Sequence, residues 1–152
     1  MWPNQNLRLK FNTYPSAKKL AKDIPDHINI IGIGTGRLVI ENPLNTNEII
    51  KLAAGQGIEQ NKNEINIWNI SEKRNISHLL LPIKNYTKDK KCIIMPKTST
   101  SFGLDKFHGP NSKQTYEELK KSGIIMRELE TCIYEGNPVA YDYGGLKNII
   151  YE

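Results

Sequence analysis

Residues 29–54 constrain the fold more than any other part of the chain. Three glycines stand at alternate positions, and a later apolar run carries a lysine; these residues are Gly32, Gly34, Gly36 and Lys51. A glycine-rich turn between two extended segments lets backbone N–H groups approach a phosphate, and a lysine one strand later can reach the same phosphate. The stretch therefore indicates nucleotide binding.

Two other phosphate-binding turns do not fit this stretch. A dinucleotide-binding turn opens a helix, and a P-loop ends in Gly-Lys-Ser/Thr. Here the sequence Arg37-Leu-Val-Ile continues as a strand instead. The alternative without a ligand is a tight hairpin whose glycines adopt positive φ. Three glycines within five residues exceed what such a turn needs, so we favour the functional interpretation.

Composition places the chain among globular proteins. It has 152 residues, of which 38% are hydrophobic and 24% charged, and its net charge is +5. The lysines are scattered, so a solvated basic surface is favoured over a dedicated nucleic-acid face. No apolar run is long enough to span a bilayer, and we expect a cytoplasmic protein with no membrane partner. Cys92 and Cys132 lie in apolar runs and are expected to be buried thiols without a nucleophilic role.

Hydrophobic periodicity and turn residues predict three helices and seven strands. The helices are expected over residues 16–23, from near 61–63 to 71, and over 112–121. The strands are expected over residues 28–33, 37–41, 48–53, 78–83, 91–95, 131–134 and 138–141.

This order of elements resembles the protein-kinase-like superfamily, including the small-molecule branch typified by aminoglycoside phosphotransferases. The sequence GIGTGRLV is similar to the glycine-rich loop G-x-G-x-x-G-x-V, with its third glycine one residue early, and EIIKLA is similar to the V-A-I-K strand. The resemblance implies that Lys51 pairs with the α/β-phosphates of ATP and that Glu64 is its ion-pair partner. It places these residues around the nucleotide: Gly32, Gly34, Thr35, Gly36, Val39, Lys51 and Met95.

The sequence GNPVAYDYGG resembles the strand that leads into the kinase D-F-G motif, which makes Asp142 the candidate Mg²⁺ ligand. The kinase catalytic loop H-R-D-L-x-x-x-N has no clear counterpart, because residues 124–131 contain neither Asp nor Asn. Glu128 could take the place of the catalytic Asp, and Glu130 could take that of the metal-binding Asn. We favour the alternative, in which both glutamates are surface groups on a degenerate loop.

The resemblance implies an α+β fold. Residues 1–97 would form a kinase-like N-lobe with a five-stranded antiparallel sheet and one packed helix, and residues 98–152 a strongly reduced C-lobe. The expected function is ATP–Mg²⁺ binding by a pseudokinase or regulatory module, with a protein partner that could complete the reduced lobe. The alternatives are an active minimal kinase that uses Glu128 or Glu130, and a small basic module that binds nucleic acid or protein.

Overall fold

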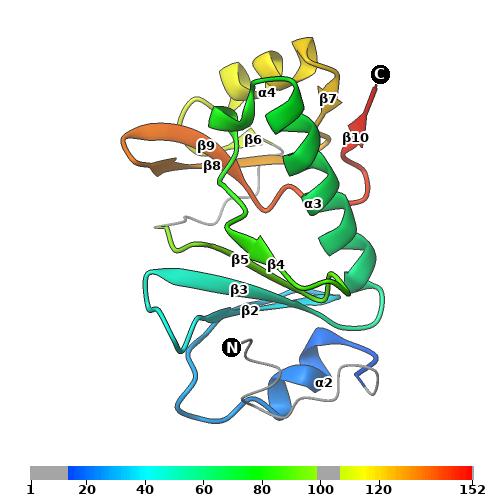
Figure 1. The fold of residues 1–152 in the computed structure, drawn as a ribbon, viewed down its shortest axis with the longest axis vertical. Coiled ribbons are helices and arrows are strands. Elements are labelled where there is room, and N and C mark those ends of the chain that lie inside the picture. The colour runs from blue at the N-terminus through cyan, green and yellow to red at the C-terminus, as the bar shows by residue number, and fades with distance from the viewer. Residues whose placement is uncertain (1–13, 99–106, 152) are drawn as a thin grey trace. The chain divides into compact units, whose positions relative to one another are not determined.

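The computed structural model describes residues 14–98 and 107–151 of the chain, which has an α+β fold (Figure 1). The chain divides into two compact units. The first unit consists of Met1–Lys62 and Ile83–Lys97, and the second consists of Asn63–Pro82 and Thr98–Glu152. Within the described ranges, no helix is both long and apolar enough to cross a bilayer.

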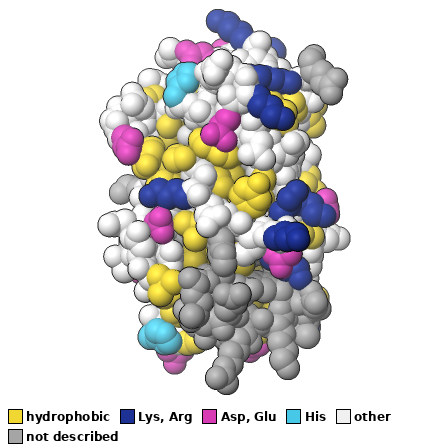
Figure 2. Space-filling view, viewed as in Figure 1, with side chains coloured by type: hydrophobic (Ala, Val, Ile, Leu, Met, Phe, Trp, Pro, Cys, Tyr) yellow, Lys and Arg dark blue, Asp and Glu magenta, His cyan; other side chains and the backbone are white. Residues whose placement is uncertain are grey.

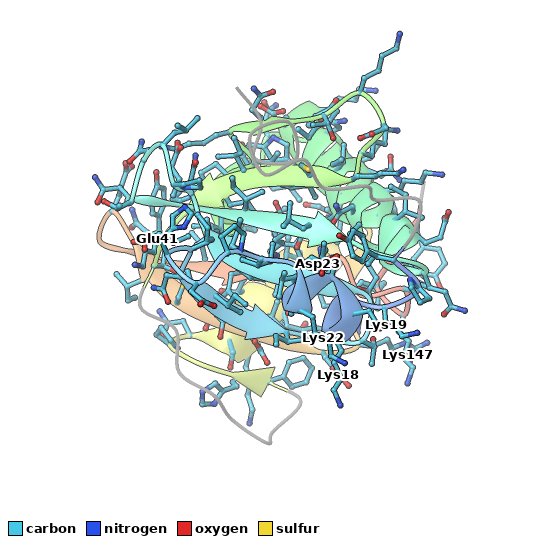
Figure 3. All side chains as sticks on the ribbon, turned by 90° about the horizontal axis from the view of Figure 1, so that it is seen from below. Lys18, Lys19, Lys22, Asp23, Glu41 and Lys147 are labelled. Atoms are coloured by element: carbon cyan, nitrogen blue, oxygen red, sulfur yellow. The ribbon has the colours of Figure 1, made fainter. Side chains whose placement is uncertain are left out.

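The first unit opens with helix α2 (Ala17–Lys22), which confirms the helix predicted over residues 16–23. Ser16 is its N-cap, and the Ser16 hydroxyl accepts a hydrogen bond from the Lys19 N–H at 3.3 Å. Ala17 and Leu20 are completely buried on one face of the helix. Its lysines extend outward on the exposed side, and Asp23 lies at its C-terminal end (Figure 3).

The first unit also contains the predicted five-stranded antiparallel sheet. Its strand order is β1-β2-β3-β5-β4, and every neighbouring pair is antiparallel. The strands are β1 (Ile30–Ile33), β2 (Arg37–Glu41), β3 (Glu48–Ala53), β5 (Cys92–Pro96) and β4 (Asn85–Tyr86). One face of this sheet packs under α2 in a core that includes Leu38, Ile40, Ile50, Leu52 and Cys92.

The fourth strand lies elsewhere than predicted. Residues 78–83 were expected to form it, but Ser77–Leu79 is a 3₁₀ helix (η2), and β4 occupies Asn85–Tyr86, between the strands predicted over residues 78–83 and 91–95. Leu79, Leu80 and Leu81 are all buried. A short run that is buried on every side has no periodicity that separates a strand from other buried structure, so the prediction was wrong.

Helix α3 (Gly57–Lys73) begins several residues before the predicted start near residues 61–63. Its first turns are polar, and they lack the apolar repeat by which a helix is recognised. Asn61 is nevertheless completely buried, because its side-chain amide donates a hydrogen bond to the Lys90 carbonyl at 2.9 Å. The Arg37 guanidinium donates to the Asn61 side-chain oxygen at 3.4 Å. A tertiary hydrogen-bond network therefore fixes the start of this helix.

The second unit contains helix α4 and two small sheets. The helix and the hairpin formed by the two longer strands confirm the elements predicted over residues 112–121, 131–134 and 138–141. A three-stranded sheet has the order β6-β8-β9, and β7 pairs with β10. The bounds are β6 (Phe107–His108), α4 (Ser112–Lys121), β7 (Ile124–Ile125), β8 (Leu129–Tyr134), β9 (Asn137–Tyr141) and β10 (Ile149–Ile150).

Candidate nucleotide site and its glycine hairpin

The glycine turn joins β1 to β2 as predicted, but its glycines differ in what they do. The Gly34 N–H donates to the Arg37 carbonyl at 2.8 Å and closes the turn. None of Gly32, Gly34 and Gly36 has positive φ, so a need for positive φ does not explain these glycines. A Cβ at Gly32 would meet no atom within 4 Å, whereas a Cβ at Gly36 would lie 2.6 Å from the Gly57 nitrogen.

Gly36 is therefore required by packing. Its carbonyl accepts a hydrogen bond from the Ala54 N–H at 2.8 Å, and its backbone lies directly against that of Gly57 at the start of α3. Gly32 has no such steric role. Packing therefore accounts for Gly36 but not for Gly32. Thr35 is exposed at the tip of the turn.

A second face of the five-stranded sheet carries the other predicted nucleotide residues of the first unit. Lys51 lies opposite Val39 on β2 and opposite Ile93 on β5. Met95 follows Ile93 by two residues, and side chains two apart on a strand share a face. Val39, Lys51 and Met95 therefore line the face opposite to the one covered by α2.

Lys51 is buried in the middle of this face. Only 4% of the residue is exposed, on the central strand β3 between β2 and β5. Lysine is almost never fully buried unless it is paired, because removing an ammonium group from water is costly. The side chain of Lys51 therefore does not extend to water at a sheet edge.

In the second unit, Glu64 lies against the segment that follows Asp142. Glu64 is completely buried, and its carboxylate accepts a hydrogen bond from the Tyr143 N–H at 2.8 Å. The Tyr143 hydroxyl in turn donates to the Leu81 carbonyl at 2.9 Å. The structure therefore brings two of the predicted motifs together: the helix-borne glutamate and the Asp-Tyr-Gly-Gly segment.

Asp142 immediately follows β9, and its side chain is exposed. Within the residues that the structure describes, no group of three or more His, Cys, Asp or Glu side chains is arranged to hold a metal. Mg²⁺ commonly binds through one or two carboxylates together with substrate phosphates rather than in a cage of protein ligands. An exposed Asp142 fits that kind of site, in which most of the ligands come from the nucleotide and water.

Two residues of the second unit that the sequence analysis missed contact this segment. The side-chain amide of Asn63 donates to the Gly145 carbonyl at 2.9 Å, and that of Asn148 donates to the Tyr143 carbonyl at 3.1 Å. The position of Asn63 next to Glu64 was the only signal that could have identified it. Asn148 gave no signal, since an asparagine after a glycine pair is typical of any loop.

The two glutamates of the expected catalytic loop have different surroundings. Only residues 126–128 separate β7 from β8, and Glu128 is exposed there. Glu130 lies within β8, not on a loop, opposite His108 on β6 and Tyr141 on β9. Burial raises the pKa of the Tyr141 phenol, and the charge and hydrogen bond of Glu130 raise this pKa further. Glu130 is thus part of a sheet contact.

The cysteines confirm the expectation of buried thiols. Cys92 and Cys132 are both buried and free. Burial is the main cause that raises the pKa of Cys92 from its ordinary value of 9.0 to about 12, and burial likewise raises the pKa of Cys132. The thiolate is the nucleophile, so neither sulfur is poised to react near neutral pH.

We expect the folded protein to resist thiol labelling. With a pKa of about 12, Cys92 is thiolate in roughly one molecule in ten thousand at pH 8. A colorimetric disulfide reagent should modify neither cysteine at pH 8 and both in guanidinium chloride. Because unfolding lowers the pKa of Cys92, this thiol should favour the unfolded state increasingly as pH rises from about 9 towards 12. Rapid labelling of the folded protein would show that Cys92 is accessible.

The predicted residues thus fall into two groups. Gly32, Gly34, Thr35, Gly36, Val39, Lys51 and Met95 belong to the first unit, and Glu64, Glu128, Glu130 and Asp142 belong to the second. Comparison of the chain with models of protein families and with curated protein sequences found no match.

Proposed function

We propose that this chain is a kinase-like protein that binds ATP with Mg²⁺ and acts as a binding or regulatory module rather than as an efficient phosphotransferase. In this proposal Lys51 binds the nucleotide phosphates, and the glycine hairpin and Val39 cover the nucleotide. Met95 contacts the base. In the second unit, Asp142 is the candidate Mg²⁺ ligand that the resemblance to the D-F-G motif implies. Bound Mg²⁺ would neutralise part of the phosphate charge.

The observation that carries this proposal is the position of Lys51. Lys51 is 4% exposed, and it shares a sheet face with Val39 and Met95, which lie on the two strands that neighbour β3. A buried cation bordered by apolar side chains offers a phosphate a strong electrostatic contact and offers a base an apolar surface. The open space around Gly32 supports the same proposal, because a backbone without side chains can approach a ligand closely.

The preference for a regulatory module rests on the segment between β7 and β8. Three residues span this connection, while the kinase pattern H-R-D-L-x-x-x-N spans eight. Glu130 is engaged with Tyr141 in the sheet, which leaves the exposed Glu128 as the candidate base on this connection. Phosphoryl transfer depends mostly on positioning and charge, so weak turnover is compatible with this arrangement.

The direct test is a titration of the full chain with ATP in the presence of Mg²⁺, followed by thermal unfolding. A ligand that binds only the folded state stabilises it by about 2.7 kcal/mol at one hundred times its Kd. We expect such a rise with ATP–Mg²⁺ and none with Mg²⁺ alone. If millimolar ATP leaves the unfolding temperature unchanged, the nucleotide proposal is wrong.

A phosphotransfer assay then separates the regulatory module from the minimal kinase. With labelled ATP, we expect no transfer above the level of an Asp142→Asn variant. Transfer that is well above this level in the wild type would identify an active kinase.

The surface charge does not by itself favour the alternative of a nucleic-acid interface. Basic side chains on the face in Figure 2 lie in several separate groups with acidic neighbours.

A further inference from the structure

Asn148 sits at the centre of a hydrogen-bond network in the second unit. It is 6% exposed, and its side-chain amide donates to the Tyr143 carbonyl at 3.1 Å. Its side-chain oxygen accepts a hydrogen bond from the Arg127 N–H at 2.9 Å. Its backbone N–H donates to the Gly145 carbonyl at 3.0 Å. One buried side chain therefore links the Asp-Tyr-Gly-Gly segment to the short connection between β7 and β8.

Asn63 reaches the same segment from α3. Its side-chain amide donates to the carbonyls of Gly145 at 2.9 Å and of Asn148 at 3.2 Å, with a longer contact of 3.5 Å to the Gly144 carbonyl. Glu64, the next residue of the helix, accepts the Tyr143 N–H. Side chains from α3 and the loop before β10 thus hold both polar groups of the Tyr143 backbone and the carbonyls that follow it.

Asp142, which precedes Tyr143 in this network, has an unusual backbone conformation. Asp142 has φ +54°, in the left-handed region that non-glycine residues adopt at a cost of about 1–3 kcal/mol. The Tyr143 N–H that follows is held by Glu64, and the Tyr143 carbonyl by Asn148. Holding the N–H and the carbonyl of Tyr143 restricts the backbone that follows Asp142, and with it the direction in which the Asp142 side chain leaves the chain.

We propose that Asn148 and Asn63 are positioning residues that orient Asp142 for Mg²⁺ bound with a nucleotide, an inference that rests on the proposed function. Asn148 also makes this orientation depend on the backbone around Arg127, which lies next to Glu128. Neither asparagine contacts the metal in this proposal.

The experiment compares ATP affinity with and without Mg²⁺ in four full-length proteins: wild type, Asn148→Ala, Asn63→Ala and a control, Asn137→Ala. Asn137 is exposed, and its side-chain amide donates to the nearby Glu135 carbonyl at 3.3 Å. Hydrogen exchange at the Tyr143 amide is measured on the same proteins. The Mg²⁺ enhancement, which is the ratio of the two affinities, isolates the contribution of the metal.

We expect Asn148→Ala and Asn63→Ala each to reduce the Mg²⁺ enhancement about tenfold and to speed exchange at Tyr143 by a similar factor, the effect of losing a buried hydrogen bond. ATP affinity without Mg²⁺ should stay within about twofold of wild type, and Asn137→Ala should match wild type in every measurement. A structural role alone would lower both affinities equally, so it would leave the enhancement unchanged.

Two results would overturn the proposal in different ways. If wild type shows a Mg²⁺ enhancement that both variants retain, the positioning role is wrong while the proposed function stands. If wild type shows no ATP binding at all, the proposed function fails and this inference fails with it. Should Asn148→Ala lose its circular dichroism signal and not fold, Asn63→Ala decides the question, because it removes contacts to carbonyls only.

Discussion

Gly57→Ala is expected to destabilise the folded protein by roughly 3 kcal/mol or more, the upper range for overpacking. A Cβ at this position would run into the backbone carbonyl of Gly36, which cannot move without disturbing its hydrogen bond with the Ala54 N–H. Gly36→Ala should act in the same direction, since its Cβ would lie 2.6 Å from the Gly57 nitrogen. For a protein of this size, each kcal/mol corresponds to about 2–4 °C in Tm.

The direction of the stability change in Gly57→Ala distinguishes a steric clash from an effect of helix propensity. Gly57 is the first residue of α3, and alanine is favoured over glycine in helices by up to about 1 kcal/mol. Propensity alone therefore predicts that Gly57→Ala is stabilising. Gly32→Ala is the matched control, because its Cβ meets no atom within 4 Å, and its stability should stay within about 0.5 kcal/mol of wild type. Thermal and urea unfolding measure all three variants, and a stabilised Gly57→Ala would contradict the close backbone contact.

Lys51→Met is expected to weaken ATP binding by roughly 10- to 100-fold, the effect of losing a charged contact to phosphate of about 1.5–3 kcal/mol. Methionine keeps the length and the apolar stem of lysine, so the sheet face with Val39 and Met95 keeps its packing. The measurement is the rise in Tm on addition of ATP–Mg²⁺, taken for each variant relative to its own ligand-free state. This difference removes any effect of the substitution on the stability of the ligand-free protein.

Lys62→Met is the matched control for charge. Lys62 is half exposed on α3, and its ammonium group lies 3.4 Å from Glu59 in a surface pair, which contributes little to stability. This variant removes the same single charge but should keep the ATP-dependent rise in Tm. If Lys51→Met also keeps the full rise, nucleotide binding does not involve Lys51, and the kinase-like interpretation of this sheet face loses its main support.

Local sequence signals predicted the elements whose determinants lie within a few residues of one another. The Ser16 cap and the apolar spacing of Ala17 and Leu20 identified α2, and the glycine turn identified the β1–β2 hairpin. Local signals failed for Leu79–Leu81, where burial on every side removes the periodicity on which a strand prediction depends. They also failed at the start of α3, where the buried Asn61 is satisfied by Lys90 on another segment.

The sequence alone determined four of the five strands of the antiparallel sheet, the placement of Lys51 on its third strand and the burial of both thiols, because alternation, turn residues and apolar runs act at short range. Only the tertiary structure decided that Gly36 serves packing while Gly32 does not, since the contact with Gly57 joins two distant turns. It also revealed how the segment after Asp142 is held. Asn63 and Asn148 are 85 residues apart, and such long-range hydrogen bonds leave no local pattern in a sequence.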